Sequence, residues 1–148
     1  MTSANPWKSY RQVAAQTAPP GKLILMLLDA AIHSMQRALQ GFDISSPGPR
    51  NEIIHNNLRH AAEVIRQLNA SLNLEAGGEL AQTLRRLYVY FDARLMESNL
   101  HKRRDGVDEV VGHITGIRDA WATMLTRLGS DGAESTSQAA ALPNALVS

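Results

Sequence analysis

Apolar residues recur along most of the chain in alternating steps of three and four, the spacing that keeps one face of an α-helix apolar. Four such segments follow one another between residues 24 and 128. Their repeating positions are Ile24, Leu28, Ala31, Met35, Ala38 and Phe42; Ile54, Leu58, Ala61, Ile65, Leu68 and Leu72; Leu80, Leu84, Leu87 and Phe91; and Val107, Val110, Ile114, Ile117, Trp121, Met124 and Leu128. No stretch alternates apolar and polar residues at every second position, so the pattern predicts an all-α fold without a sheet.

Proline, glycine and aspartate mark where these helices begin and end. Pro19 and Pro20 open the first long helix, where their missing N–H donors cost nothing. Gly41 and the stretch SSPGP (45–49) close it, and Asp105 is the expected N-cap of the last helix. Helices of matched length joined by short connections are antiparallel neighbours. The sequence therefore predicts an antiparallel up-down four-helix bundle over residues 17–128.

Two pieces lie outside the expected bundle. Residues 1–16 carry Trp7, Tyr10 and Ala14 on one face of a short helix. A helix of about ten residues is too short to be stable alone in water, so it is ordered only by docking onto the bundle. It is either a movable capping helix or a permanently packed strap. Residues 129–148 are small, polar and without period, which predicts a disordered C-terminal tail.

Composition narrows the class of protein. The 148 residues suffice for one core, and the absence of cysteine excludes disulfides and cysteine-based zinc sites, which fits a reducing compartment. A net charge of +1 argues against a protein that binds nucleic acid by neutralising many phosphates. The start of the chain is polar, unlike a signal peptide, and the apolar run 23–28 stops at Asp29, far short of the roughly 20 residues that span a membrane. We expect a cytoplasmic protein without membrane insertion.

The first long helix carries more apolar side chains than one core stripe needs. Leu25, Ile32 and Leu39 form a row beside the stripe, and Leu23 and Leu27 lie on its other side. Neighbouring helices and the N-terminal piece could cover these rows, which would make a wide core. Alternatively, the rows line a groove that takes an amphipathic helix from another protein.

The third long helix shows the same excess. Ala81, Tyr88 and Leu95 run beside the stripe that ends in Phe91, and Tyr90 flanks it on the opposite side. Tyrosines at such positions bury the ring and leave the hydroxyl in water, which suits a core edge or a partner surface. Of the two tyrosines, we expect Tyr88 to contact a partner.

Candidate chemistry along the chain is weak. Glu52 and His55 have the Glu-x-x-His spacing of di-iron bundles, but no second copy exists, and Glu109 with His113 fits an ordinary solvated pair. The HKRR run (101–104) is better explained as a charged helix end than as a nucleic-acid site. The sequence predicts no enzyme, metal or cofactor. A histidine phosphotransfer-like signalling bundle, using His60 or His113, is the alternative function.

Three stretches resemble the FliS family of flagellar export chaperones, over about residues 10–125. TAPPGKLILMLLDAAI (17–32) is similar to the family's Thr-Ala-Ser-Pro-x-Lys-Leu-Ile-x-Met-Leu-Tyr-Asp-Gly-Ala-Ile, LNLEAGGELAQTLRRLYVYFDARLMESN (72–99) carries its Gly-Gly-Glu and Leu-Tyr features, and IRDAW (117–121) resembles its last-helix signature. The chain departs from the pattern at Pro19, which replaces an N-cap serine, and at Leu28 and Ala30, which replace a tyrosine and a glycine.

The resemblance implies a cytoplasmic chaperone that binds the C-terminal segment of flagellin and keeps it from polymerising before export. It also implies contact with the flagellar export gate and an N-terminal cap that covers part of the binding surface, here carried by Tyr10. Weak self-association through the same surface is compatible with the sequence. The residues expected to contact flagellin are Tyr10, Leu23, Leu25, Leu27, Ile32, Tyr88 and Leu95.

Overall fold

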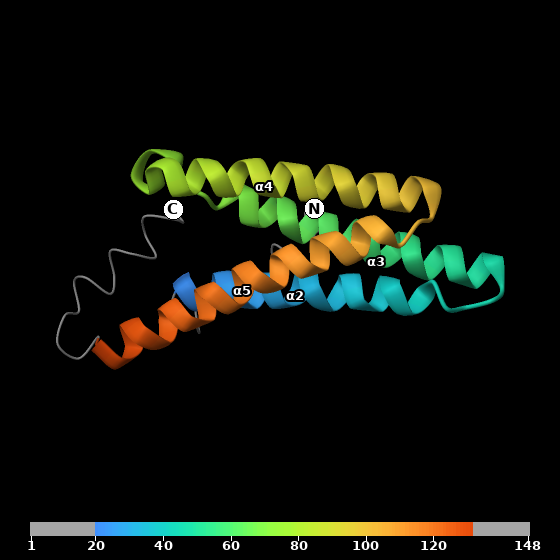
Figure 1. Ribbon diagram of the computed structural model, residues 1–148, viewed down its shortest axis with the longest axis horizontal. Coiled ribbons are helices and arrows are strands. Elements are labelled where there is room, and N and C mark those ends of the chain that lie inside the picture. The colour runs from blue at the N-terminus through green and yellow to red at the C-terminus, as the bar shows by residue number, and fades with distance from the viewer. Residues whose placement is uncertain (1–19, 132–148) are drawn as a thin grey trace, which may run out of the picture.

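The computed structural model describes residues 20–131, which form four antiparallel helices. They are α2 (Pro20–Gly41), α3 (Pro47–Ala70), α4 (Leu74–His101) and α5 (Asp105–Asp131). Figure 1 shows each helix running back along the one before it. The all-α bundle predicted from the periodicity is thereby confirmed. The expected capping helix with Tyr10 lies outside the described residues, as does residue 132 onward of the expected tail; at its start, residues 129–131, the tail prediction was wrong, because α5 continues to Asp131.

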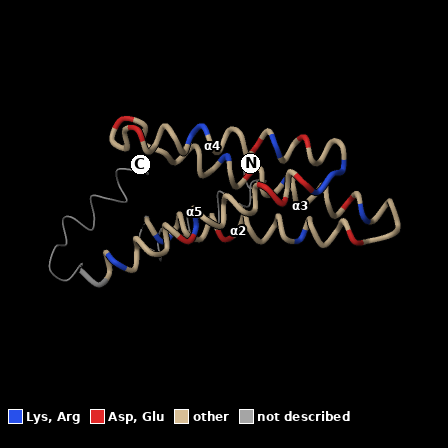
Figure 2. The backbone as a smooth tube through the Cα atoms, viewed as in Figure 1, with Lys and Arg blue, Asp and Glu red and all other residues tan. Residues whose placement is uncertain are grey.

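The four helices close around one apolar core. α2 packs against α3 and α5, and α4 packs against the same two helices. Figure 2 shows acidic and basic residues interspersed along all four helices, so no helix carries a block of one sign. None of the helices within residues 20–131 is long and apolar enough to cross a membrane.

Three of the four predicted stripes form the core as expected. Each supplies a run of buried side chains: Ile24, Leu28, Ala31, Met35 and Ala38 from α2, Ile54, Leu58, Ala61, Ile65 and Leu68 from α3, and Val107, Val110, Ile114 and Trp121 from α5. Phe42 and Leu72, just beyond the ends of α2 and α3, and Ile117 and Met124 of α5 are only partly buried against the core. Period alone therefore identified the inward face of these helices correctly.

The prediction for α4 was wrong about which row faces inward. The row beside the predicted stripe, Ala81, Tyr88 and Leu95, is buried, and of the stripe itself only Phe91 is fully buried. Both rows are apolar and have helical spacing, so the sequence pattern is compatible with either row facing the core. The packing of α4 between α3 and α5 turns the leucines of the stripe toward the α5 edge instead of the centre.

The reversal between α3 and α4 is complete by Asn73, which caps the start of α4. The Asn73 side chain accepts a hydrogen bond from the Ala76 N–H at 3.0 Å and so caps a first helical turn that begins at Leu74. Gly78 then interrupts the helix with φ 58° and ψ −136°, a conformation open to glycine because it has no Cβ. Residues 73–78 are thus a capped turn followed by a kink.

Candidate partner-binding surface

α4 and α5 are held together in the half nearest their connecting turn. The Tyr90 hydroxyl donates to Glu109 Oε2 at 2.5 Å, and Arg94 Nε donates to Glu109 Oε1 at 2.8 Å. These hydrogen bonds, that from Tyr90 first, lower the pKa of the Glu109 carboxyl below its usual range. The ring of Phe91 stacks on His113, with centroids 5.7 Å apart. Glu109 and His113 thus both serve the contact with α4, where the sequence predicted a solvated pair.

Away from the turn, the leucine stripe of α4 becomes progressively exposed. Phe91 is fully buried, Leu87 and Leu84 are partly buried, and Leu80 is 56% exposed. These residues share one face because they lie three or four positions apart. This increase in exposure shows that neighbouring helices no longer pack over this face toward the start of α4. In Figure 1 the two helices diverge in the same direction.

The facing edge of α5 carries apolar side chains, Ala120, Met124 and Leu128, among polar ones. Because the helices are antiparallel and Phe91 lies against His113, Leu87 falls near the level of Ile117 and Leu80 near that of Met124. A pocket of about 540 Å³ runs along this edge, and its lining residues in the described chain are Asp119, Ala120, Thr123, Met124, Arg127 and Leu128. We call the space between the Leu80–Leu84–Leu87 stripe and this edge of α5 the α4–α5 cleft.

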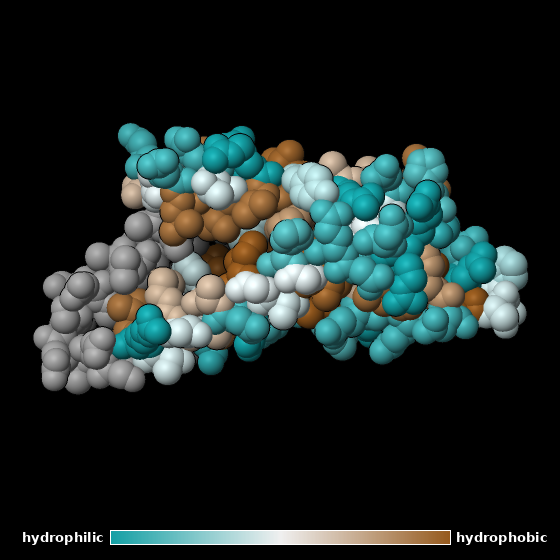
Figure 3. Space-filling model, viewed as in Figure 1, coloured by the Kyte–Doolittle hydropathy of each residue, from teal (hydrophilic) through white to brown (hydrophobic). Residues whose placement is uncertain are grey.

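Figure 3 shows the same feature on the surface. Hydrophobic residues gather over the first half of α4, and a hollow separates them from further apolar residues below. Teal, hydrophilic residues cover the other half of this view, where the two helices meet. The described molecule therefore offers a concave apolar strip with polar rims, the shape that accepts an amphipathic helix.

Two polar contacts fix α5 on α2 and bring together two of the stretches that resemble the FliS family. The indole Nε1 of Trp121 donates to the Gly21 carbonyl at 2.8 Å, and Arg118 Nε donates to Asp29 Oδ1 at 2.7 Å. IRDAW (117–121) is therefore an architectural motif that seats the last helix on the first described one.

The predicted contact residues of α2 occupy its two flanks. Leu25 and Ile32 lie on the side of Asp29, which faces α5, and they are partly buried against the core, as is Leu23. Leu27 is buried, with 1% of its surface exposed. Because α2 packs on α3 and α5, the structure does not bring these four residues to the leucine stripe of α4.

The predicted contact residues of α4 are buried. Tyr88 and Leu95 are 3% and 1% exposed, and burial raises the pKa of the Tyr88 phenol to about 12. Tyr88 packs edge-on against Phe91 at 6.5 Å between centroids. Since they have almost no exposed surface, Leu27, Tyr88 and Leu95 support the bundle in this conformation and do not line a groove. The more exposed tyrosine of α4 is Tyr90, whose hydroxyl bonds Glu109 of α5.

A second exposed apolar row on α4 was missed by the sequence reasoning. Val89, Met96 and Leu100 are exposed on its outer face, Leu100 by 77%. Their spacing of seven and four residues puts them on one side, a signal that the stronger leucine stripe masked. Arg66 of α3 reaches this row, with its Nη2 3.8 Å from Met96 Sδ.

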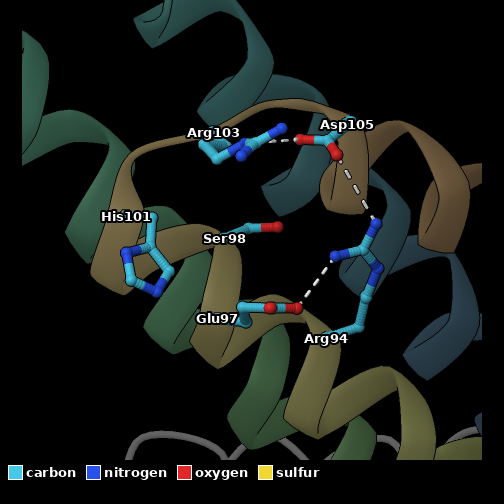
Figure 4. Close-up of a pocket in the computed structure, with 6 residues that line it drawn as sticks. All are labelled: Arg94, Glu97, Ser98, His101, Arg103 and Asp105. Carbon is cyan, nitrogen blue, oxygen red and sulfur yellow. Dashed lines mark hydrogen bonds and ion pairs between the residues drawn. The ribbon is translucent and has the colours of Figure 1, made fainter.

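A charged pocket of about 410 Å³ lies at the α4–α5 turn (Figure 4). Arg94 pairs with Glu97 at 2.9 Å and with Asp105 at 3.6 Å, and Arg103 pairs with Asp105 at 3.5 Å. The cations are thus balanced by carboxylates within the pocket. The buried Ser98 hydroxyl points into the same pocket, between these charged side chains, and it has no hydrogen-bond partner among residues 20–131.

The remaining candidate groups serve helix contacts. Lys102, in the left-handed conformation, caps α4 and bonds the Asn99 carbonyl at 2.6 Å, as expected of a charged helix end. His60 shares a hydrogen bond of 2.8 Å with Ser34 of α2, and His55 shares one of 2.9 Å with Asn99. Within residues 20–131, no three acidic or histidine side chains are placed to hold a metal ion.

A four-helix bundle with an uncovered apolar cleft is typical of proteins that bind a segment of another protein. The family is shown by comparison. The sequence pattern described as "Flagellar protein FliS" matches residues 3–127. This chain belongs to the FliS family, as its three quoted stretches indicated.

Curated relatives agree with this assignment. The chain is 33% identical to the "Flagellar secretion chaperone FliS" of Bacillus subtilis (strain 168), over 82% of this chain and 86% of the relative. It is 35% identical to the protein of the same name from Salmonella typhimurium, over 82% and 90%, and 31% identical to that of Escherichia coli (strain K12), over 84% and 93%. Membership in a family of flagellar secretion chaperones implies a protein partner in flagellar export.

Proposed function

We propose that this chain is a cytoplasmic export chaperone that binds the C-terminal segment of flagellin. It would prevent premature polymerisation and keep flagellin competent for flagellar type III secretion. The observation that carries the proposal is the α4–α5 cleft, where a leucine stripe continuous with the core is left uncovered in a member of a secretion-chaperone family. The proposed role is one of binding, without an enzymatic step, a cofactor or a metal.

The physical reason for such a cleft lies in the client. A segment that forms a helix only in the assembled filament has an apolar face that meets other copies when it is exposed. Covering that face with the Leu80–Leu84–Leu87 stripe prevents the encounter. Ordering the segment on binding offsets much of the favourable burial, which leaves an affinity that permits release.

The two sides of the cleft would hold different parts of the client helix. Leu80 and Leu84 supply the exposed part of the α4 wall, and Met124 supplies the α5 wall. Arg127 and Asp119 at the rim can pair with charges beside the client's apolar face. A long client segment that leaves the cleft would continue over the flanks of α2.

The residues expected from the sequence take two roles in this proposal. Leu23, Leu25 and Ile32 retain exposed surface for such a continuation, whereas the buried Leu27, Tyr88 and Leu95 hold the helices beneath it. Tyr10 remains the proposed competitor in the N-terminal cap. The export gate, as receptor of the loaded chaperone, is the second proposed partner.

Calorimetric titration with intact flagellin and with flagellin lacking its C-terminal segment tests the function. We expect binding to the intact protein and none to the truncated one; equal binding to both, or to neither, refutes the proposal. Leu80→Glu tests the cleft, since charging a residue that contributes about 1.5–3 kcal/mol on burial weakens binding tenfold or more. Leu100→Glu, at a still more exposed site on the outer face of the same helix, is the matched control and leaves affinity within about twofold.

The proposed cap is tested by Tyr10→Ala. Removing the ring favours the uncapped chaperone, so we expect tighter binding of the flagellin segment and faster proteolysis within residues 1–16. Unchanged affinity together with unchanged proteolysis would favour the permanently packed strap.

A further inference from the structure

α5 ends at Asp131, at the open side of the α4–α5 cleft, and 17 residues follow it, GAESTSQAAALPNALVS. They lie beyond the family match, which stops at residue 127. We infer that the apolar part of this segment, AAALPNALV (139–147), occupies the cleft of the same molecule when no client is bound. The segment would then be an internal competitor of the client.

The segment is long enough to reach the cleft. Met124 lies about 10 Å and Ile117 about 21 Å back along α5 from Asp131, at about 1.5 Å per residue. Leu142 follows Asp131 by eleven residues, which span up to roughly 36–40 Å when extended. The chain can therefore reverse direction after α5 and still place Leu142 and Leu146 anywhere along the cleft.

The chemistry of the segment matches the cleft. Residues 135–148 contain no charged side chain, and Leu142, Leu146 and Val147 are its largest apolar groups. The α4 wall is leucine, and the pocket along α5 is lined by Ala120, Thr123, Met124 and Leu128 together with the charged Asp119 and Arg127. An uncharged apolar segment enters such a strip without burying an unpaired charge.

The same sequence limits how tightly the segment binds. Pro143 interrupts the apolar run and disfavours one continuous amphipathic helix. Its contacts are therefore fewer than those of a helical client that follows the whole stripe. Weak contacts still fill the cleft because the tether keeps the segment at a local concentration in the millimolar range. A second copy of the chain at micromolar concentration cannot match that, which favours this occupant over a dimer.

Paramagnetic labelling tests the docking directly. The chain has no cysteine, so Ser148→Cys in the full-length protein accepts a single nitroxide. We expect broadening of backbone amide signals over residues 80–87 and 117–128, and its loss when Leu142→Ser and Leu146→Ser are added. A nitroxide at Ser45→Cys, in the loop between α2 and α3, is the control and leaves both ranges sharp.

Two results would overturn the inference. One is the same weak broadening in the cleft with and without the two leucines. The other is broadening that appears when labelled and isotope-enriched copies are mixed, because that signal reports contact between molecules.

The consequence for binding rests on the proposed function and is measured separately. If the segment occupies about nine-tenths of free molecules, Leu142→Ser with Leu146→Ser tightens binding of the flagellin C-terminal segment about tenfold. Equal affinities of variant and parent would refute competition. If broadening is seen but no flagellin binds to either, the docking stands and the proposed client is wrong.

Discussion

The joint between α4 and α5 leads to a prediction that can be worked out from atomic positions. A Cβ added at Gly106 would overlap the hydroxyl oxygen of Ser98 and lie 3.3 Å from Arg94 Cγ. Ser98 is buried, so its hydroxyl cannot simply move into solvent. Gly106→Ala therefore overpacks the joint, at a cost of about 1–3 kcal/mol. Helix propensity acts in the opposite direction, since alanine is better than glycine by about 1 kcal/mol.

A glycine elsewhere on α5 separates these two effects. A Cβ at Gly112 meets nothing within 4 Å, so Gly112→Ala gains the helix propensity without the clash. The difference in unfolding free energy between the two variants is the overpacking alone, about 1–3 kcal/mol. For a domain of this size, each kcal/mol corresponds to roughly 2–8 °C in Tm.

Removal of the overlapped oxygen should rescue the joint. Ser98→Ala deletes a buried hydroxyl that has no hydrogen-bond partner in the described chain, so by itself it leaves stability unchanged or raises it. Ser98→Ala with Gly106→Ala should match Gly112→Ala within about 0.5 kcal/mol. Urea denaturation followed by circular dichroism measures all four variants. Gly106→Ala as stable as Gly112→Ala, or no rescue by Ser98→Ala, would refute the reasoning.

Three further changes probe other joints of the bundle. Gly78→Ala forces a Cβ into the φ 58° kink at the start of α4 and should cost about 1–3 kcal/mol. Trp121→Phe removes the hydrogen bond to the Gly21 carbonyl and leaves that acceptor without its indole partner, so we expect a loss of about 1–3 kcal/mol. Partial desolvation beside Ser34 lowers the pKa of His60, a residue that keeps much of its surface exposed, below its ordinary value of 6.5, so the unfolded chain binds the proton more tightly. Stability contributed by neutral His60 is then present above about pH 6.5 and falls as the pH drops below it.

Matched variants make these three outcomes decisive. Gly116→Ala, with open space around the added Cβ, should stabilise where Gly78→Ala destabilises. Trp121→Phe in urea denaturation should shift the midpoint without changing the slope, and an unchanged midpoint would contradict the role of the indole N–H. His60→Gln should flatten the fall in Tm between pH 7 and pH 5, whereas His33→Gln, at another exposed site, should leave the fall in Tm unchanged. An equal fall in both histidine variants would contradict the assignment.

Within residues 20–131, the sequence by itself determined the four helices, their order, and the inward face of three of them. α2, α3 and α5 each carry one dominant apolar stripe, so only one orientation satisfies the period. The residues that mark the family were also readable, because they are local runs such as IRDAW. The sequence could not predict that Arg118 binds Asp29 or that Trp121 binds Gly21, because these partners are about 90–100 positions away along the chain.

Tertiary structure decided the orientation of α4 and hence the candidate site. α4 has two adjacent apolar rows, and local spacing gives no reason to bury Tyr88 and Leu95 rather than Leu80 and Leu84. The choice follows from the joint near the turn, where Phe91 stacks on His113 and Glu109 binds side chains of α4. That joint rotates the leucine stripe to the α5 edge, and the divergence of the helices then leaves Leu80 uncovered. A cleft of this kind depends on the angle between two helices, a property that no single stretch of sequence encodes.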